Sequence, residues 1–366
     1  MKATWVEISR EALHHNLDEL ACQLAHACEQ NKGPAIALGL VVKGDAYGHG
    51  LLPVVSLAAA HPAVSYFFTA SLQEALEVRA LAPSHGVCAL VPADSQFLDE
   101  ALANAIDLVG FSEHWCGVVS ERAQTLGIMA RIHIKLETGL ARLGIPMDDV
   151  VAIVRRIVAL PNIELVGVMT HLADVVGDDI PFAREQRVCF EQACSQLRAA
   201  GISWRWTHAN ASGGLSFVGV DTLVRVGTAL YGYWKSEPER VRSQSVRGPF
   251  DLKPVLTWKS RVMHCAYVEP GQTIGYGQTF CATRPMSIAV IPVGYSDGYP
   301  RSLSNQGAVL IKGQLAPVVG RVSMNVLTVD VTDIPGACDE GELLEVILVG
   351  PQQGVTADKV AQKRGP

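Results

Sequence analysis

The chain has 366 residues, of which 49% are hydrophobic and 18% charged, a globular composition with enough length for about two domains. Its formal net charge is -6 and it has no run of Lys and Arg, which argues against a nucleic-acid-binding protein. Charged residues such as Glu7 and Arg10 interrupt the stretch where an export signal would lie, and every apolar run is too short to cross a bilayer. The nine cysteines are scattered without a CxxC pair, which predicts reduced, buried thiols in a cytoplasmic protein.

Eight short apolar runs alternate with longer amphipathic segments over the first two-thirds of the chain. The runs cover residues 35–43, 65–70, 87–91, 106–110, 131–137, 164–171, 204–210 and 222–227. This β–α alternation predicts a parallel sheet, and eight units over roughly 215 residues fit a (β/α)8 barrel better than an open sheet. An open doubly wound sheet would normally have a GxGxxG turn after its first strand, where this chain reads KGDAYGHG.

After about residue 249 the pattern becomes strand-like, with Gly, Pro and Asp between the apolar runs. These runs cover residues 255–268, 287–293, 308–311, 316–331 and 343–349. We therefore expect an α/β protein in which residues 1–248 form a TIM-like barrel and residues 249–366 a mainly β domain. The first strand of the chain is free to pack with the second domain.

Polar residues gather at the ends of the predicted barrel strands, where TIM barrels carry their chemistry. They are Lys43, Arg142, His171, Asn210 and Arg225, which end or closely follow the first, fifth, sixth, seventh and eighth runs. Each alone has an ordinary structural explanation, but all five share one end of the barrel. A lysine that condenses with an aldehyde needs a lowered pKa, which burial near cations provides, and arginines bind carboxylates.

Glycines after the seventh and eighth runs, at Gly213–Gly214 and Gly227, suit a phosphate bound by backbone N–H groups. The sequence has no HExxH motif and no EF-hand loop, so we expect no metal site. The segment Gly294–Gly298 reads GYSDG and matches the nucleophile elbow of serine hydrolases. That elbow requires a helix directly after the serine, whereas the turn-rich YPRSLSNQG follows here, which argues against a hydrolase.

The segment VVKGDAYGHG resembles the attachment motif for pyridoxal 5'-phosphate (PLP) in alanine racemases. The likeness continues, in the order of that family, through KLETGLARLGI, GVMTHLADV, HANASGG, VRVGTALYG, TIGYGQTF, VGYSDGYPR and GRVSMNVLTVD. It covers nearly the whole chain and implies a barrel followed by a β domain. It also implies a cytoplasmic, PLP-dependent isomerase that interconverts L- and D-alanine for cell-wall peptidoglycan, as a homodimer with active sites shared across subunits.

The resemblance implies two catalytic bases, Lys43, which also holds PLP covalently, and Tyr276, which comes from the other subunit. Two bases on opposite faces of the substrate explain racemisation, because one removes the Cα proton and the other delivers a proton. Arg225 is implied to hydrogen-bond the pyridine nitrogen of PLP, with His171 orienting it. An arginine does not readily release a proton, so this nitrogen should stay unprotonated.

The same resemblance places Arg142 near the substrate carboxylate, and Tyr295 and Met324 at the substrate entrance as residues of the partner subunit. Lys135 stands at a position that is carbamylated in several family members. The residues implied to surround the phosphate are Tyr47, Asn210, Ser212, Gly227 and Thr228.

Three features depart from the family pattern. Ala211 replaces a serine after Asn210, which makes Ser212 the candidate for that hydroxyl, and Asn325 replaces an aspartate after Met324. The chain also stops at VTADKVAQKRGP, before a short final segment that normally carries a tyrosine at the phosphate, so we expect that contact to be missing.

Three alternatives stay open. A PLP-dependent decarboxylase shares the architecture and a cysteine–acid pair, but Cys338-Asp339 lies in a turn-like segment, and TIGYGQTF and GRVSMN favour the racemase. Non-catalytic PLP-binding barrels lack the β domain and with it Tyr276. Serine-preferring and broad-specificity racemases have the same core motifs as the alanine enzymes.

Overall fold

The computed structural model describes residues 4–31, 35–92, 94–177, 180–248, 250–338 and 344–364. The chain divides into two compact units. Arg10–Lys253 forms the barrel unit, whereas Met1–Ser9 and Pro254–Pro366 together form the β unit. None of the described helices combines the length and the apolar character that a membrane span requires.

The barrel unit is built on an eight-stranded parallel sheet with the order β8-β7-β6-β5-β4-β3-β2-β9. Its strands are β2 (Ala37–Val41), β3 (Val64–Thr69), β4 (Gly86–Ala89), β5 (Asp107–Gly110), β6 (Ala130–Lys135), β7 (Ile163–Met169), β8 (Trp206–His208) and β9 (Leu223–Val226). The two edge strands meet through backbone hydrogen bonds, from Thr222 to Thr207 (2.8 Å) and from Arg225 to Asn210 (3.1 Å). The sheet is thus a nearly closed barrel, which confirms the predicted (β/α)8 fold.

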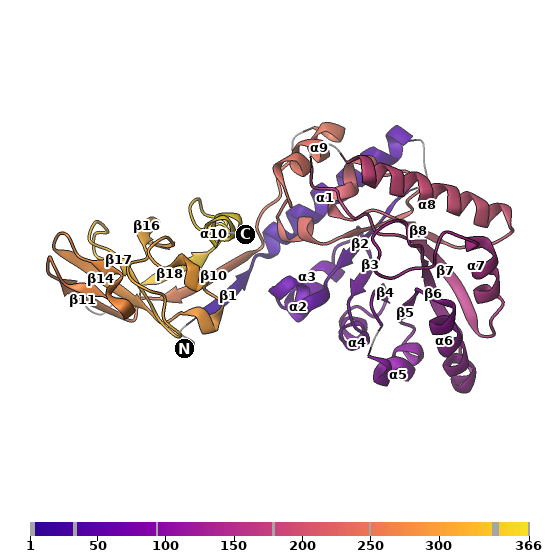
Figure 1. The fold of residues 1–366 in the computed structure, drawn as a ribbon, viewed down its shortest axis with the longest axis horizontal. Coiled ribbons are helices and arrows are strands. Elements are labelled where there is room, and N and C mark those ends of the chain that lie inside the picture. Colours follow the sequence, from indigo (N-terminus) through magenta and orange to yellow (C-terminus); the bar gives the residue numbers. More distant parts are fainter. Residues whose placement is uncertain are drawn as a thin grey trace. The chain divides into compact units, whose positions relative to one another are not determined.

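Helices follow the strands and cover the barrel. They are α1 (Arg10–Asn31), α3 (Leu51–Ala59), α4 (Leu72–Leu81), α5 (Leu98–Ala103), α6 (Glu113–Leu126), α7 (Val150–Val158), α8 (Pro181–Ala199) and α9 (Glu237–Arg247). Figure 1 shows α4 to α8 outside the strands. Serines begin three of these helices, α4, α6 and α9. Ser71, Ser112 and Ser236 accept hydrogen bonds from the free backbone N–H groups of Glu74, Trp115 and Glu239 respectively.

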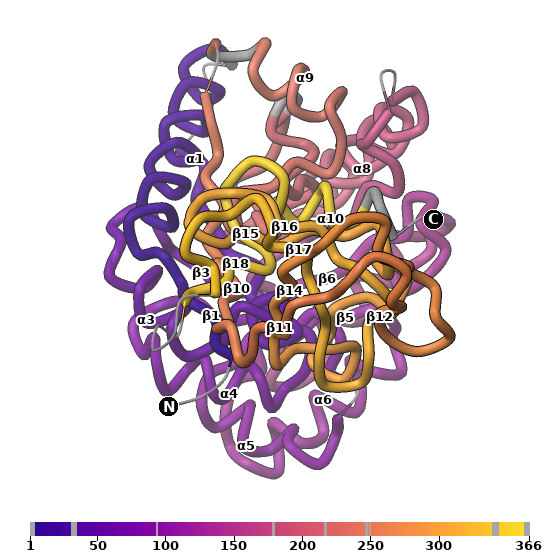
Figure 2. Tube along the Cα trace, turned by 90° about the vertical axis from the view of Figure 1, so that its left-hand side faces the viewer, coloured from indigo at the N-terminus to yellow at the C-terminus, as the bar shows by residue number. Residues whose placement is uncertain are grey.

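The β unit contains a five-stranded sheet with the order β1-β10-β18-β15-β16 and a three-stranded sheet with the order β11-β14-β17. The first comprises β1 (Thr4–Ile8), β10 (Leu256–Arg261), β18 (Glu345–Val349), β15 (Ala308–Ile311) and β16 (Gln314–Pro317). The second comprises β11 (His264–Val268), β14 (Met286–Ile291) and β17 (Leu327–Asp330), and a hairpin joins β12 (Thr273–Ile274) to β13 (Phe280–Cys281). The strands pair antiparallel, and Figure 2 shows β10, β15 and β18 together.

Two runs that the sequence suggested as continuous strands are interrupted in the β unit. Residues 255–268 split into β10 and β11, which belong to different sheets. Residues 316–331 split into the end of β16 and β17, with an irregular segment between them. Gly320 lies in that segment at φ 80°, and a Cβ there would come within 2.6 Å of the Ile274 carbonyl oxygen. The chain must therefore leave the sheet at this point. The helix α10 (Ala357–Arg364) lies near the end of the chain.

The expectation that all cysteines are reduced, buried thiols is wrong for several of them. Cys265 on β11 and Cys338 form a disulfide with their Cα atoms 5.6 Å apart, and Cys22 and Cys281 are exposed. The bonded pair is 73 residues apart in the chain, so only the fold brings it together. Spacing along the sequence could not reveal this pair.

Asp221 provides a test of how the barrel closes at the start of β9. Its buried carboxylate accepts hydrogen bonds from Ala209 N (2.6 Å), Asn210 Nδ2 (2.9 Å) and Arg187 Nη2 on α8 (2.8 Å). Replacing it by alanine leaves buried N–H donors without their acceptor and takes from Arg187 one of its two carboxylate partners, the other being Glu191, which should lower the free energy of unfolding by about 3–5 kcal/mol. Urea denaturation measures this loss. Asp99→Ala, which removes an exposed ion pair with Arg122, should change stability little, and equal effects of the two variants would contradict the assignment.

Candidate active site

A cavity of about 550 Å3 lies at the carboxyl ends of the barrel strands. Lys43 follows β2, Lys135 ends β6, His171 follows β7 and Arg225 lies within β9, and all four line the cavity. Other sequence-predicted residues that line it are Tyr47, Arg142, Ser212, Gly227 and Thr228. The structure therefore brings together the barrel residues singled out in the sequence, with the exception of Asn210, Gly213 and Gly214, which do not line this cavity.

The chain after Lys43 forms a left-handed turn. Gly44, Asp45, Ala46 and Tyr47 in α2 (Lys43–Gly48) have φ between 53° and 63°. In this conformation the Cβ atom crowds the following carbonyl oxygen, which costs about 1–2 kcal/mol for each residue other than glycine. A strained turn of this kind persists only where its surroundings hold it.

The carboxylate of Glu74 on α4 holds this turn in place. It accepts hydrogen bonds from the backbone N–H groups of Gly44 (2.6 Å) and Asp45 (3.1 Å), and its second oxygen accepts one from Ala70 (3.0 Å). At the other end of the turn, Asp45 Oδ1 accepts a hydrogen bond from Leu51 N (2.6 Å). Sequence reasoning missed Glu74, because its spacing from Ser71 indicates only the start of a helix.

Tyr47, Ser212, Gly227 and Thr228 gather on one side of the cavity. A Cβ at Gly227 would lie 2.6 Å from the Tyr47 hydroxyl oxygen, so only glycine leaves room for that hydroxyl. Ser212 Oγ accepts hydrogen bonds from Gly227 N (3.1 Å) and Ala229 N (3.3 Å). The Ser212 hydroxyl therefore lies in the site, although Ala211 itself has none. The buried hydroxyl oxygen of Thr228 has no hydrogen-bond partner among the described residues.

Asn210 points elsewhere. Its Nδ2 donates to Asp221 (2.9 Å), and a Cβ at Gly214 would come within 2.1 Å of its Oδ1. The side chain is fully buried between these groups and does not line the cavity.

Arg225 is buried, and fixed acceptors hold both its terminal nitrogens. Nη1 donates to His208 Nδ1 (2.7 Å) and to the His208 carbonyl oxygen (2.7 Å), while Nη2 donates to the Thr170 carbonyl oxygen (2.7 Å) and to His171 Nδ1 (3.3 Å). Burial and then the charge of Arg225 lower the pKa of His171 to about 3, so this imidazole is neutral and can accept. Nε of Arg225 has no acceptor among the described residues.

Cations set the electrostatics of the cavity. Burial, followed by the charges of Arg142 and Lys235, lowers the pKa of Lys43 below its ordinary value. Burial and Arg142 lower the pKa of Lys135 to about 8. Lys235, which lines the cavity just before α9, was missed from the sequence because the polar segment around it reads as an ordinary surface. The site therefore suits anionic groups and a lysine that is easily deprotonated.

The three remaining predicted residues lie in the β unit and are exposed, Tyr276 by 72%, Tyr295 by 45% and Met324 by 56%. Tyr295 N donates to the Ser323 carbonyl oxygen (3.0 Å), which joins the segments carrying Tyr295 and Met324. Asn325, the departure next to Met324, donates from Nδ2 to Ser296 Oγ (3.0 Å).

Family comparisons decide what this arrangement represents. The alanine racemase N-terminal domain matches residues 8–235, and the alanine racemase C-terminal domain matches residues 255–366. The chain belongs to the alanine racemase family. An alanine racemase of Syntrophobacter fumaroxidans is 39% identical over 368 residues, covering all of this chain and 93% of the relative.

Solved alanine racemases share the fold. The structure from Clostridium difficile 630 has a TM-score of 0.88 at 29% identity, covering 100% of this chain and 91% of that one. The structure from Bartonella henselae, with covalently bound pyridoxal phosphate, has a TM-score of 0.81 at 26% identity, covering 99% and 94%.

The residues of this alanine racemase family member fit PLP. Lys43 offers an amine with a lowered pKa, the buried Thr228 hydroxyl has no partner among the described residues, and Arg225, whose described hydrogen bonds all use Nη1 and Nη2, lines the same cavity. These groups suit an aldehyde, a phosphate and a ring nitrogen respectively.

Glu74→Ala tests whether the left-handed turn positions Lys43. Without the carboxylate the strained turn should relax, and the dissociation constant of PLP should rise by about tenfold, the size expected for losing charge-assisted hydrogen bonds. Fluorescence titration of the cofactor-free protein with PLP measures this change. Glu77→Ala, on the exposed side of the same helix, is the matched control, and a turn that binds PLP equally well without Glu74 would contradict the role.

Proposed function

We propose that this protein is an alanine racemase that interconverts L- and D-alanine with PLP held by Lys43, and so supplies D-alanine for peptidoglycan. The observation that carries the proposal is the meeting of Lys43, Arg142 and Arg225 in one cavity, in a chain of this family. The lowered pKa of Lys43 supports its role as the amine that attacks the PLP aldehyde.

In this proposal the barrel residues bind and orient. Tyr47, Ser212 and Thr228 hold the phosphate, and Nε of Arg225 donates to the ring nitrogen. Arg142 attracts the substrate carboxylate. Bound PLP withdraws electrons from the substrate, which makes its Cα proton acidic enough for side-chain bases.

Lys43 and Tyr276 then act as the two bases. Lys43 Nζ exchanges the Cα proton on one face of the substrate, and Tyr276 Oη exchanges it on the other. A proton removed by one and replaced by the other inverts the centre. We propose a cytoplasmic homodimer, and the exposure of Tyr276, Tyr295 and Met324 supports their assignment to the active site of the partner subunit.

The choice between alanine and serine as substrate is tested directly. L-Alanine and L-serine are incubated separately with protein and PLP, and the D-products are measured by chiral chromatography. D-Alanine should appear well ahead of D-serine. Faster formation of D-serine would move the assignment to a serine-preferring racemase, and no product despite bound PLP would favour a non-catalytic relative.

Subunit mixing tests the two bases and the shared site together. Lys43→Ala should lose covalent PLP and its visible absorbance, and Tyr276→Phe should keep PLP but lose racemisation. When the two inactive variants are unfolded, mixed and refolded, half of the dimers should combine them. Each such dimer has one site with both bases, so about a quarter of wild-type activity should return.

The result distinguishes between two arrangements. If Lys43 and Tyr276 of the same subunit formed each site, every site in a mixed dimer would lack one base and no activity would return. Each variant refolded alone is the control. A Tyr276→Phe variant that racemises normally would instead remove Tyr276 from the proposal.

We further propose that Lys135 is carbamylated. The neutral amine attacks CO2, a C–N bond forms and a proton leaves, so a cation is replaced by an anion beside Arg142. Because burial lowers the pKa of Lys135 to about 8, the neutral amine is available near physiological pH. Intact-protein mass spectrometry should detect the gain of one CO2, rising with bicarbonate and with pH through about 8. Lys135→Gln should abolish it, and an unmodified Lys135 in saturating bicarbonate would overturn the proposal.

A further inference from the structure

A line of polar side chains crosses the interior of the barrel, starting at Arg225. Barrels of this type normally fill their interior with branched apolar residues. Here Arg225, His208, His133 and Asp107 occupy it, each no more than 2% exposed. Buried polar groups are costly unless each finds a partner, so their arrangement calls for a physical explanation.

The four side chains are joined by hydrogen bonds. Arg225 Nη1 lies 2.7 Å from His208 Nδ1, and His208 Nε2 lies 2.8 Å from His133 Nδ1. His133 Nε2 lies 3.3 Å from Asp107 Oδ2 and 3.1 Å from the Tyr66 hydroxyl oxygen. The chain thus connects the proposed active site to the first residue of β5, at the opposite end of the barrel.

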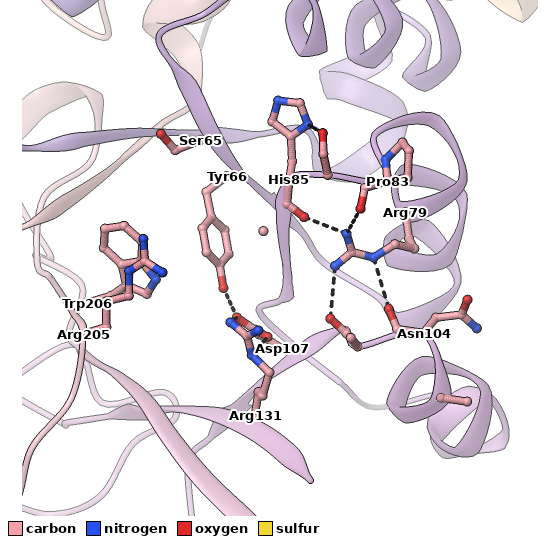
Figure 3. Close-up of a pocket in the computed structure, with 14 residues that line it drawn as sticks. Ser65, Tyr66, Arg79, Pro83, His85, Asn104, Asp107, Arg131, Arg205 and Trp206 are labelled. Carbon is pink, nitrogen blue, oxygen red and sulfur yellow. Dashed lines mark hydrogen bonds and ion pairs between the residues drawn. The ribbon is translucent and has the colours of Figure 1, made fainter. Parts of the chain in front are cut away.

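Asp107 is the anionic end of this chain, beside a second cavity at the amino ends of the strands. Figure 3 shows Tyr66 and Arg131 directed toward its carboxylate. The Tyr66 hydroxyl donates to Oδ2, and Arg131 Nε lies 2.9 Å from Oδ1. Three groups therefore donate to or pair with this carboxylate: Tyr66, Arg131 and His133.

The chemistry of the end groups fixes the direction of every hydrogen bond. A guanidinium can only donate, so His208 Nδ1 must accept and its proton must lie on Nε2. His133 Nδ1 then accepts from His208, which leaves the proton of His133 on Nε2, facing Asp107 and the Tyr66 oxygen. A carboxylate can only accept, so the chain ends there without conflict.

Reversal of these tautomers would disturb Arg225. With its proton on Nδ1, His208 would present a donor to Arg225 Nη1, and two donors at 2.7 Å repel each other. Burial, followed by the charge of Arg225, lowers the pKa of His208 well below its ordinary value, which keeps this imidazole neutral. The donor at one end, Arg225, and the acceptor at the far end, Asp107, therefore select the same neutral tautomers.

We propose that Asp107 is a positioning residue for Arg225, acting through His133 and His208. Its carboxylate accepts at the far end of the chain and so stabilises the same tautomers that Arg225 requires, with His208 Nδ1 as the acceptor that orients the guanidinium. The proposed effect on the cofactor rests on the proposed function, in which Arg225 faces the PLP ring nitrogen. The hydrogen-bond order of the chain does not depend on that contact.

The first experiment reads the tautomers in the holoenzyme. Long-range proton–nitrogen correlation spectra of protein containing isotope-labelled histidine show which ring nitrogen carries the proton. Both His133 and His208 should be neutral with the proton on Nε2. A proton on Nδ1 of either histidine would overturn the proposal, and this measurement needs no variant that has to fold.

The second experiment uses variants of the far end. Asp107→Leu removes the carboxylate and leaves the Tyr66 hydroxyl, which can donate to His133 Nε2 as well as accept from it, so the tautomers should mix and kcat should fall by about 10- to 100-fold with little change in KM. Asp107→Asn keeps one acceptor oxygen and should restore most of kcat and both tautomers. Arg131→Met disturbs the same end but keeps the carboxylate, and should retain the wild-type tautomers.

Isotope-labelled PLP separates this inference from the proposed function. Its ring-nitrogen resonance should shift in Asp107→Leu and in Arg225→Lys. If neither variant moves it, Arg225 does not face the ring and the proposed function fails at that contact. If only Arg225→Lys moves it, and Asp107→Leu leaves tautomers and kcat unchanged, the positioning role of Asp107 is wrong.

Discussion

Burying the guanidinium of Arg225 inside the barrel is the constraint on which the rest of the proposed active site depends. A buried cation needs acceptors on its donating nitrogens, because an unpaired donor at such a site costs several kcal/mol. The acceptors are the carbonyl oxygens of Thr170, His208 and Ala209 and the two imidazoles of His171 and His208. All of these come from the carboxyl ends of β7 and β8, so the position of Arg225 depends on how these strands meet β9.

That meeting point is also where the barrel closes. Asp221, just before β9, accepts hydrogen bonds from Ala209 N after β8 and from Arg187 on α8, and so connects these three elements. It also accepts a hydrogen bond from the side chain of Asn210. The same carboxylate therefore serves closure and keeps Asn210 out of the cavity. The side chain of Asn210 therefore stabilises the closure of the barrel, whereas the sequence had placed it at the phosphate.

The cations of the cavity follow from this framework. Neutral histidines suffice as partners of Arg225. Burial first, and then the charge of Arg142, lowers the pKa of both Lys43 and Lys135, and Lys235 adds to the effect on Lys43 and Arg225 to that on Lys135. Lys43 and Lys135 are both easier to deprotonate as a result, although only Lys43 stands directly before a strained turn. Glu74 opposes this effect electrostatically, since its charge raises the pKa of Lys43, while its hydrogen bonds hold the turn. Position and basicity of Lys43 are thus set by different neighbours.

The barrel and most of the residues in its cavity could be predicted from the sequence because both rest on local patterns. Apolar runs of strand length, each followed by a helical segment, fix the order of strands, and the rule for strand ends then places Lys43, His171 and Arg225 together. Contacts that depend on distant segments could not be predicted. Glu74 reaches back 30 residues to the turn at Gly44, and Cys265 bonds across 73 residues.

The polar chain through the barrel illustrates the same limit more sharply. His133, His208 and Asp107 sit in apolar strand runs, where a histidine or aspartate gives no periodic signal, and their pairing depends on the register of β5, β6, β7 and β8. In that register a Cβ at Gly167 would lie 2.1 Å from His133 Nδ1, so β7 must carry a glycine beside the histidine. The room for this imidazole is therefore built into a neighbouring strand. An apolar side chain in place of His133 could fill the space. It could not form the hydrogen bonds through which Asp107 stabilises the tautomer of His208 that Arg225 requires.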